Sequence, residues 1–209
     1  MAEPAQQPGR GASFFGTPTL VLMAVAIAVN VVAGQLAGNV LRLPLYLDSI
    51  GTVLVGVLAG PVAGIVTGVL SNLLWGVTFG AVSSMPFAIV AGLIGLLAGA
   101  FGARGVFRAS RGPVGGLWVA VAGFVTGILA AVVAAPIAYF VFGGTTGGGT
   151  DLIVVVFREM TGSVFSAVLL QAGIVDPIDK AVSFLVVWAI LLAVPLSVKT
   201  LFPQGDRAA

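Results

Sequence analysis

SIGTVLVGVLAGPVAGIVTGVLSNLLWGVTFGAVSSMPFAIVAGLIGLLAGAFGA, residues 49–103, decides the class of fold, because it contains no charged side chain. A helix that spans the hydrocarbon core of a bilayer needs about 20 predominantly apolar residues. The stretch is long enough for two or three such helices, and Gly60-Pro61 and residues 83–86 offer turns between them. Residues 11–41 and 112–150 are uncharged as well. The sequence therefore predicts an all-α membrane protein.

The composition of the chain agrees with this prediction and excludes several functions. Of the 209 residues, 59% are hydrophobic and 8% are charged, whereas soluble proteins carry about 25% charged residues. Cysteine and histidine are absent, which removes thiolate chemistry and the commonest general base and metal ligand. No phosphate-binding loop and no nucleophile with an accompanying base is recognised. We therefore expect no enzyme, no catalytic residue, no metal, no cofactor and no nucleic-acid partner.

One transmembrane domain is expected at residues 19–202, between short cytoplasmic tails at 1–18 and 203–209. Apolar runs and turn signals predict six transmembrane helices, at 19–38, 47–60, 62–78, 86–103, 114–142 and 178–201. The segment 151–172 also has a helical pattern, but it contains Arg158 and Glu159. Either it crosses the membrane as a seventh helix, or it is a re-entrant or peripheral helix on the outer side.

Basic residues set the expected orientation. The loop 104–113 carries Arg104, Arg108 and Arg111 and no acidic residue, so it is expected in the cytoplasm. With six spans, both termini and the turn at Gly60-Pro61 then lie on the same side. The same rule favours six spans over seven.

The segment 39–49, here called the hinge, is expected on the outer side, where Pro44 prevents a regular helix. Asp48 is placed to meet the positive end of the following helix dipole. One interpretation is an N-cap aspartate with an interfacial arginine and tyrosine. The other is a cap over an outward-facing cavity, in which Tyr46 and Asp48 contact a ligand.

Asn72 and Trp75 fall in the outer half of the helix expected at 62–78. An asparagine inside a membrane helix must find a hydrogen-bonding partner, which is either another helix or a ligand. Trp75 is either an interfacial anchor or a stacking surface for that ligand.

The residues whose transfer into a membrane costs the most free energy are ionisable residues in the C-terminal part of the chain. Arg158 and Glu159 belong either to a peripheral helix or to an aqueous cavity. Asp176 and Pro177 are expected to open the last helix. Asp179 and Lys180 either form buried pairs with Arg158 and Glu159 or are solvated cap residues. The costly polar and amphipathic groups all map to one side of the bilayer, which predicts a site for a small polar molecule; these groups are Tyr46, Asp48, Asn72, Trp75, Arg158, Glu159 and Asp179.

Small residues recur at four-residue spacing, which lets membrane helices approach closely. Ala24 and Ala28 on the first helix, and Gly64 and Gly68 on the third, are examples. Such pairs serve either packing within the chain or the docking of another subunit.

Two blocks of the sequence together resemble the substrate-binding S component of an energy-coupling factor (ECF) transporter. They are LPLYLDSIGTVLVGVLAGPVAGIVTGVLSNLLWG at 43–76 and VDPIDKAVSFLVVWAILLAVPLSV at 175–198. The resemblance implies vitamin uptake across the plasma membrane of a prokaryote, with a transmembrane coupling protein and two ATPase subunits as partners. It also implies that Ala24 and Ala28 dock the coupling protein. Ala33 and Ala37 match that pattern equally well, and the segment 151–172 departs from the family's usual pattern.

Two other functions remain as alternatives to an S component that captures a vitamin-like molecule. A stand-alone secondary transporter or channel would place ionisable residues at the midplane in inverted repeats. A membrane sensor module has similar sequence blocks. Co-purification with ATPases would distinguish an S component from a secondary transporter, a channel or a sensor module.

Overall fold

The structure, a computed structural model, describes residues 15–108 and 112–208, and within these ranges it consists of helices and loops. The all-α prediction is thereby confirmed. The α-helices are α1 (Thr17–Gly34), α2 (Ile50–Ala59), α3 (Pro61–Thr78), α4 (Ala88–Ala103), α5 (Gly112–Phe142), α6 (Asp151–Thr161), α7 (Val164–Ala193) and α8 (Leu196–Lys199). A π-helical segment, η1 (Gln35–Val40), continues α1, and the 3-10 helices η2 (Val82–Phe87) and η4 (Gly205–Ala208) precede α4 and end the described chain.

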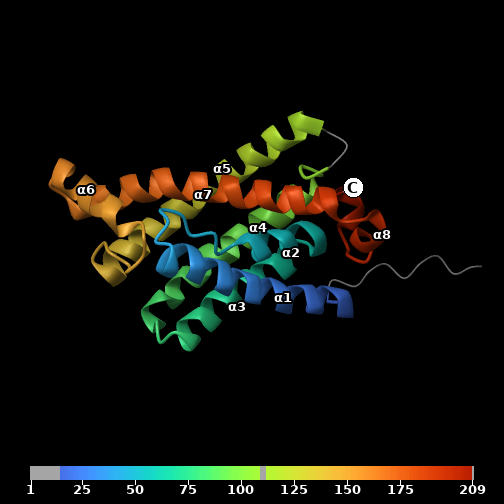
Figure 1. Cartoon of the computed structure of the whole chain (residues 1–209), viewed down its shortest axis with the longest axis horizontal. Helices are drawn as coiled ribbons and strands as arrows, with labels where there is room; N and C mark the ends of the chain where they lie inside the picture. Colours follow the sequence, from blue (N-terminus) through green and yellow to red (C-terminus); the bar gives the residue numbers. More distant parts are fainter. Residues whose placement is uncertain (1–14, 109–111, 209) are drawn as a thin grey trace, which may run out of the picture.

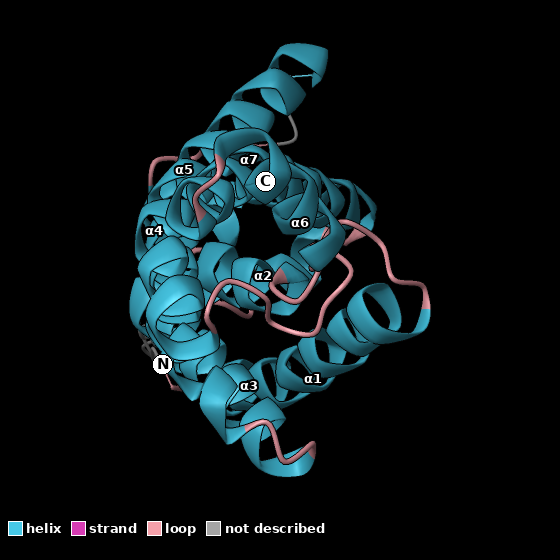
Figure 2. Cartoon of the chain, turned by 90° about the vertical axis from the view of Figure 1, so that its left-hand side faces the viewer, coloured by secondary structure: helices cyan, strands magenta, loops and turns pink. Residues whose placement is uncertain are grey.

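The long helices run side by side, and the short helix α2 lies among them (Figures 1 and 2). Helix α2 packs against α1, α3, α4 and α7, and most of its residues are buried. Its end is sharp because Gly60 takes a φ of 100°, which glycine adopts without steric cost, and Pro61 opens α3. The turn expected at Gly60-Pro61 is therefore present, and it places α2 at the centre of the bundle.

Glycines allow α2, α3 and α4 to pack backbone against backbone. A Cβ atom added to Gly64 would lie 2.6 Å from the carbonyl oxygen of Gly95, and one added to Gly56 would lie 2.9 Å from the same atom. At Gly68, an added Cβ would overlap the backbone of Ala91. These small residues therefore serve packing within the chain, as close helix packing in lipid requires.

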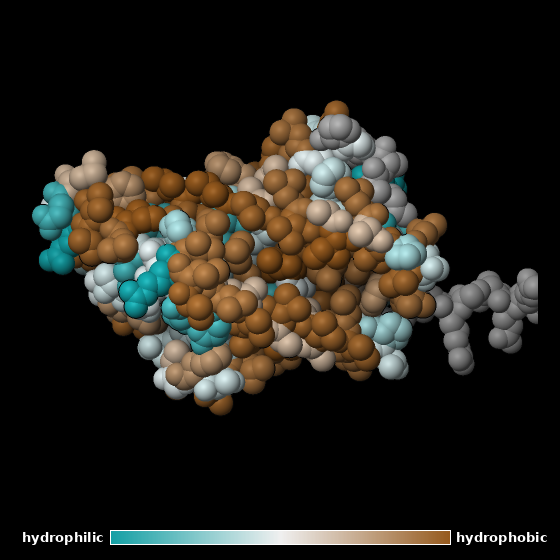
Figure 3. All heavy atoms as spheres, in the orientation of Figure 1, coloured by the Kyte–Doolittle hydropathy of each residue, from teal (hydrophilic) through white to brown (hydrophobic). Residues whose placement is uncertain are grey.

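Four segments of the described chain are long and apolar enough to cross a membrane, namely Thr17–Val40, Pro61–Thr78, Val82–Ala103 and Val114–Phe142. A broad hydrophobic surface covers the middle of the face seen in Figure 3, and hydrophilic residues gather toward the end that carries α6. This is the surface expected of an integral membrane protein. Helix α2 is shorter, with 10 residues, and α7 has 30 residues but includes Asp176, Asp179 and Lys180.

The structure corrects the expected helices at 151–172 and 178–201. Helix α6 ends at Gly162, whose φ of 67° forms a left-handed C-cap, and Ser163 then caps α7 by accepting a hydrogen bond from the Ser166 N–H. Helix α7 continues through Pro177 and ends before Pro195. The segment 151–172 is thus neither one span nor one peripheral helix, because its second half belongs to α7.

The C-terminal residues fold back onto the end of the bundle that carries Arg104. The backbone N–H of Gln204 donates to the carbonyl oxygen of Leu58 (2.8 Å), and Arg207 Nη1 donates to that of Ala103 (3.0 Å). Arg104 and the described residues of the C-terminal tail therefore lie at one end of the bundle, and the side of the membrane that this end faces stays a prediction. Residues 1–14 of the expected N-terminal tail, Arg111 and the last residue of the C-terminal tail lie outside the described residues.

Candidate functional site

A cavity of about 440 Å³ lies at the other end of the bundle. Its wall includes the end of α3 with Trp75 and Phe79, η2 with Phe87, and the end of α5 with Phe142. The hinge and α7 complete the wall. Because α4 leads from η2 at this end to Arg104 at the opposite end, the cavity and the arginine lie at opposite ends of the bundle.

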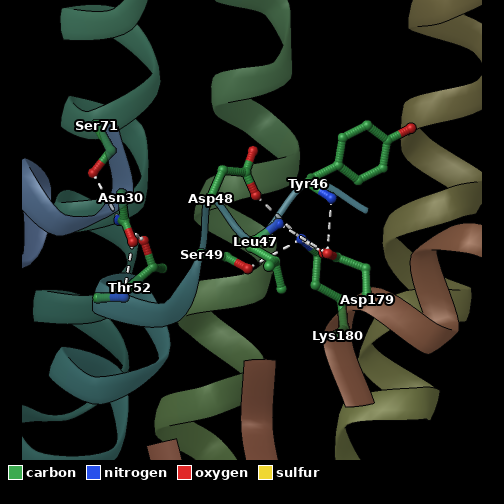
Figure 4. A network of polar contacts seen from close by, with 10 residues as sticks. Asn30, Tyr46, Leu47, Asp48, Ser49, Thr52, Ser71, Asp179 and Lys180 are labelled. Carbon is green, nitrogen blue, oxygen red and sulfur yellow. Dashed lines mark hydrogen bonds and ion pairs between the residues drawn. The ribbon is translucent and has the colours of Figure 1, made fainter. Parts of the chain in front are cut away.

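Helix α7 holds the hinge in place through two adjacent side chains (Figure 4). Asp179 Oδ1 accepts hydrogen bonds from the backbone N–H groups of Tyr46 and Leu47, both at 2.9 Å. Lys180 Nζ donates to Ser49 Oγ at 3.0 Å and to Asp48 Oδ1 at 3.3 Å, and it also pairs with Asp179. Asp179 and Lys180 are buried, and a buried charge is tolerated only when it is paired and hydrogen-bonded.

Tyr46 connects the hinge to two further elements. Its phenolic oxygen accepts a hydrogen bond from Gln171 Nε2 of α7 at 3.1 Å, and its hydroxyl donates to Thr150 Oγ1 at 3.5 Å. Tyr46 therefore joins the hinge to α7 and to the loop 143–150 through hydrogen bonds.

The glycine-rich loop 143–150 packs against the hinge. A Cβ atom at Gly149 would overlap the carbonyl group of Leu43, so the two segments touch through their backbones. Asp151 orders the loop by accepting hydrogen bonds from the N–H groups of Thr146 (2.9 Å) and Gly147 (2.7 Å). Both segments line the cavity and form non-helical parts of its wall.

A second polar cluster, on the opposite side of the hinge from Tyr46, joins α1, α2 and α3 (Figure 4). Asn30 Nδ2 donates to Thr52 Oγ1 at 2.8 Å and to Ser71 Oγ at 3.0 Å, and Asn30 Oδ1 accepts from the Gly51 N–H at 2.8 Å. These contacts satisfy the buried amide, so Asn30 fixes three helices at the cavity. Sequence reasoning overlooked it, although an asparagine in an apolar helix was the available signal.

The residues expected from the sequence to bind ligand separate into three groups. Tyr46, Asp48, Asn72 and Trp75 line the cavity, whereas Asp179 is buried and holds the hinge. Arg158 and Glu159 are exposed on the last turns of α6 and do not line the cavity. Both alternatives for Asp179 and Lys180, pairing with Arg158 and Glu159 or a role as solvated cap residues, are wrong, because both residues are buried within α7 and bind the hinge.

Other wall residues were missed for a common reason. Gln171, Asp176 and Lys180 all line the cavity from one continuous helix, α7. The sequence reading divided this helix at Pro177, so the three side chains were not placed on one wall. Gly127 of α5 meets the helix at that proline, since a Cβ there would overlap the backbone of Asp176 and Pro177.

The alanines expected to dock a partner lie on the outer surface of α1. Ala24 and Ala28 are exposed, together with Val21 and Val25, while Ala26 faces inward. Ala37, which fitted the same spacing, is buried. Ala24 and Ala28 therefore remain accessible to another helix.

Comparison of the chain with protein-family models, with curated proteins and with solved structures finds no match. The geometry alone has the features of a small-molecule site. Amide, hydroxyl, carboxylate and aromatic groups converge on one cavity, which is the usual composition of such sites.

Proposed function

We propose that this protein is the substrate-capture (S) component of an ECF-type importer of a prokaryotic plasma membrane. It binds a small vitamin-like molecule from outside and delivers it with a separate coupling protein and two ATPase subunits. The observation that carries the proposal is the cavity at the end of the bundle opposite to Arg104, in which a few polar side chains converge within a largely apolar wall. If that arginine is cytoplasmic, as the positive-inside rule predicts, the cavity belongs to the outer half of the membrane.

The proposed topology has six spans, α1, α2, α3, α4, α5 and α7, with α6 at the outer surface. Helix α2 has 10 residues and is about 15 Å long, so the hinge must complete its path across the bilayer. Irregular backbone at membrane depth is tolerated where it is covered by protein or lines a cavity, as the hinge does. The charged residues of α7 are buried and face the hinge and the cavity, which fits a membrane-spanning helix.

The proposed partners meet the outer face of α1. The small side chains of Ala24 and Ala28 allow a partner helix to approach closely, and the surrounding valines are otherwise covered by lipid. Docking there leaves the cavity untouched, because the inward face of α1 carries Asn30 and packs on α2 and α3.

A stand-alone secondary transporter is the second candidate. It is favoured by the buried Asp176, Asp179 and Lys180, since intramembrane ionisable groups often couple substrate movement to an ion gradient. Two of these three groups, however, are engaged in holding the hinge.

Purification from the native membrane in a mild detergent tests the proposal. We expect the chain to co-purify with a transmembrane coupling protein and two ATPase subunits, and mass spectrometry to detect a bound small molecule. Uptake of that molecule into proteoliposomes that contain this chain alone would instead identify a secondary transporter.

A further inference from the structure

The cavity wall contains a buried carboxylate, that of Asp176, which accepts no hydrogen bond from the described residues. Asp176 lines the cavity and is 5% exposed, and no hydrogen-bond donor reaches its carboxylate from the part of the chain that the structure describes. Lys180 lies one turn further along α7, and its ammonium group has three donors. The Lys180 ammonium group donates its hydrogen bonds to Asp48, Ser49 and Asp179, so none is left for Asp176.

The charges of the wall are unbalanced. Asp48, Asp151 and Asp176 line the cavity, whereas Lys180 is its only cationic side chain among residues 15–108 and 112–208. Lys180 already pairs with Asp179 behind the wall and with Asp48. Asp151 accepts hydrogen bonds from backbone N–H groups of the glycine-rich loop, which bring no net charge. The cavity therefore has an excess of negative charge, and Asp176 is its least compensated group.

Aromatic rings occupy the wall as two pairs. Trp75 and Phe79 have ring centroids 5.0 Å apart, and Phe87 and Phe142 have centroids 5.7 Å apart. The face of an aromatic ring attracts cations, and flat ring systems stack on it. These rings add to the attraction that the carboxylates exert on a cation.

We infer that the cavity binds an organic cation, a flat ring system that carries a protonated amino or amidinium group, with Asp176 as its counter-ion. The inference rests on the proposed capture function and narrows its ligand class. Burying a carboxylate is costly unless it is paired and hydrogen-bonded, and a cationic donor supplies both the charge and the hydrogen bond. A neutral ligand would supply only the hydrogen bond, and an anion would be repelled.

Three probes of nearly equal shape test the charge preference, namely naphthalene-2-carboxamidine (cationic), naphthalene-2-carboxamide (neutral) and naphthalene-2-carboxylate (anionic). Their binding to the full-length purified protein is measured by calorimetry at neutral pH. The amidine should bind roughly tenfold or more tightly than the amide, and the carboxylate most weakly, because the hydrogen bond to Asp176 is charge-assisted.

Asp176→Asn should reduce the affinity for the amidine to that for the amide, whereas Asp206→Asn, an exposed residue at the other end of the bundle, should leave the preference intact. Equal affinities for the three probes, a preference for the carboxylate, or no binding of any probe to the wild-type protein would overturn the inference. A preference that survives in Asp176→Asn would overturn the role of Asp176. Co-purification with ATPases does not depend on the charge of the probes. A cavity without a preference for cations would therefore contradict this inference and leave the proposed function untouched.

Discussion

Lys180 Nζ, in the interior of α7, lies 3.3 Å from the Asp48 carboxylate of the hinge. The contact acts together with Asp179, which holds the backbone N–H groups of Tyr46 and Leu47. Leu47 has a φ of 53°, a conformation that a leucine adopts only when its surroundings enforce it. Two neighbouring residues of α7 thus hold the hinge in a strained conformation at the cavity wall.

Removing the Lys180 charge should destabilise the protein. Lys180→Met leaves the buried carboxylate of Asp179 without its cationic partner, and loss of one partner from a buried pair costs about 3–5 kcal/mol. The free energy of unfolding in detergent measures the effect. The double variant Lys180→Met/Asp179→Asn should recover part of the loss, and a single variant as stable as the wild type would contradict the assignment.

The six-span topology predicts which positions a membrane-impermeant thiol reagent reaches. The chain has no cysteine, so single cysteines can be introduced into a clean background. In intact cells Thr145→Cys and Glu159→Cys should be labelled, whereas Arg108→Cys and Asp206→Cys should react only after lysis; all four positions are exposed. Labelling of Asp206→Cys in intact cells would rule out six spans with a cytoplasmic C-terminus.

Bulk on the outer face of α1 should block assembly without affecting the cavity. Ala24→Leu and Ala28→Leu each place a larger side chain where a partner helix would approach, so the coupling protein should be lost on purification. Ligand affinity, measured by calorimetry, should remain unchanged. The matched control is Ala189→Leu, an exposed alanine on α7. If all three variants assemble equally well, the docking face lies elsewhere.

Asn72 and Glu159 should now behave differently, although the sequence predicted that both bind ligand. Asn72→Ala removes a hydrogen-bonding group from the cavity wall and should weaken binding of the co-purified molecule roughly tenfold. Glu159→Gln changes an exposed residue of α6 and should have no effect on affinity. Calorimetry on both purified variants distinguishes the two, and an effect at Glu159 alone would move the site to α6.

Much of the fold could be predicted from the sequence because its signals are local. The apolar runs predicted the helices, and Gly60-Pro61 predicted the turn into α3, since the conformational preferences of glycine and proline are fixed by their own covalent structure. The boundary at Pro177 was wrong for a non-local reason. A proline ends a helix unless packing compensates, and here Gly127 brings α5 against the helix at that residue.

The candidate site was predictable only in part for the same reason. Tyr46, Asp48, Asn72 and Trp75 are distinctive by residue type, and all four line the cavity. The role of Asp176 depends on where the donors of Lys180 point, which is a property of the assembled bundle. The sequence suggested that Arg158 and Glu159 are ionisable side chains buried at membrane depth. Both are exposed on α6, so neither has to be stabilised by a buried partner.

The backbone contacts among Gly56, Gly64 and Gly95 limit which substitutions the protein can tolerate during evolution. Every single-nucleotide replacement of a glycine codon by another amino acid adds at least a Cβ atom, and at these positions that atom meets backbone, which cannot rotate away. Outward-facing positions such as Ile89 and Val132 bear no such restriction and can exchange freely among apolar residues. Descendants of this sequence should therefore diverge fastest where the molecule meets lipid and retain the spacing of their glycines longest.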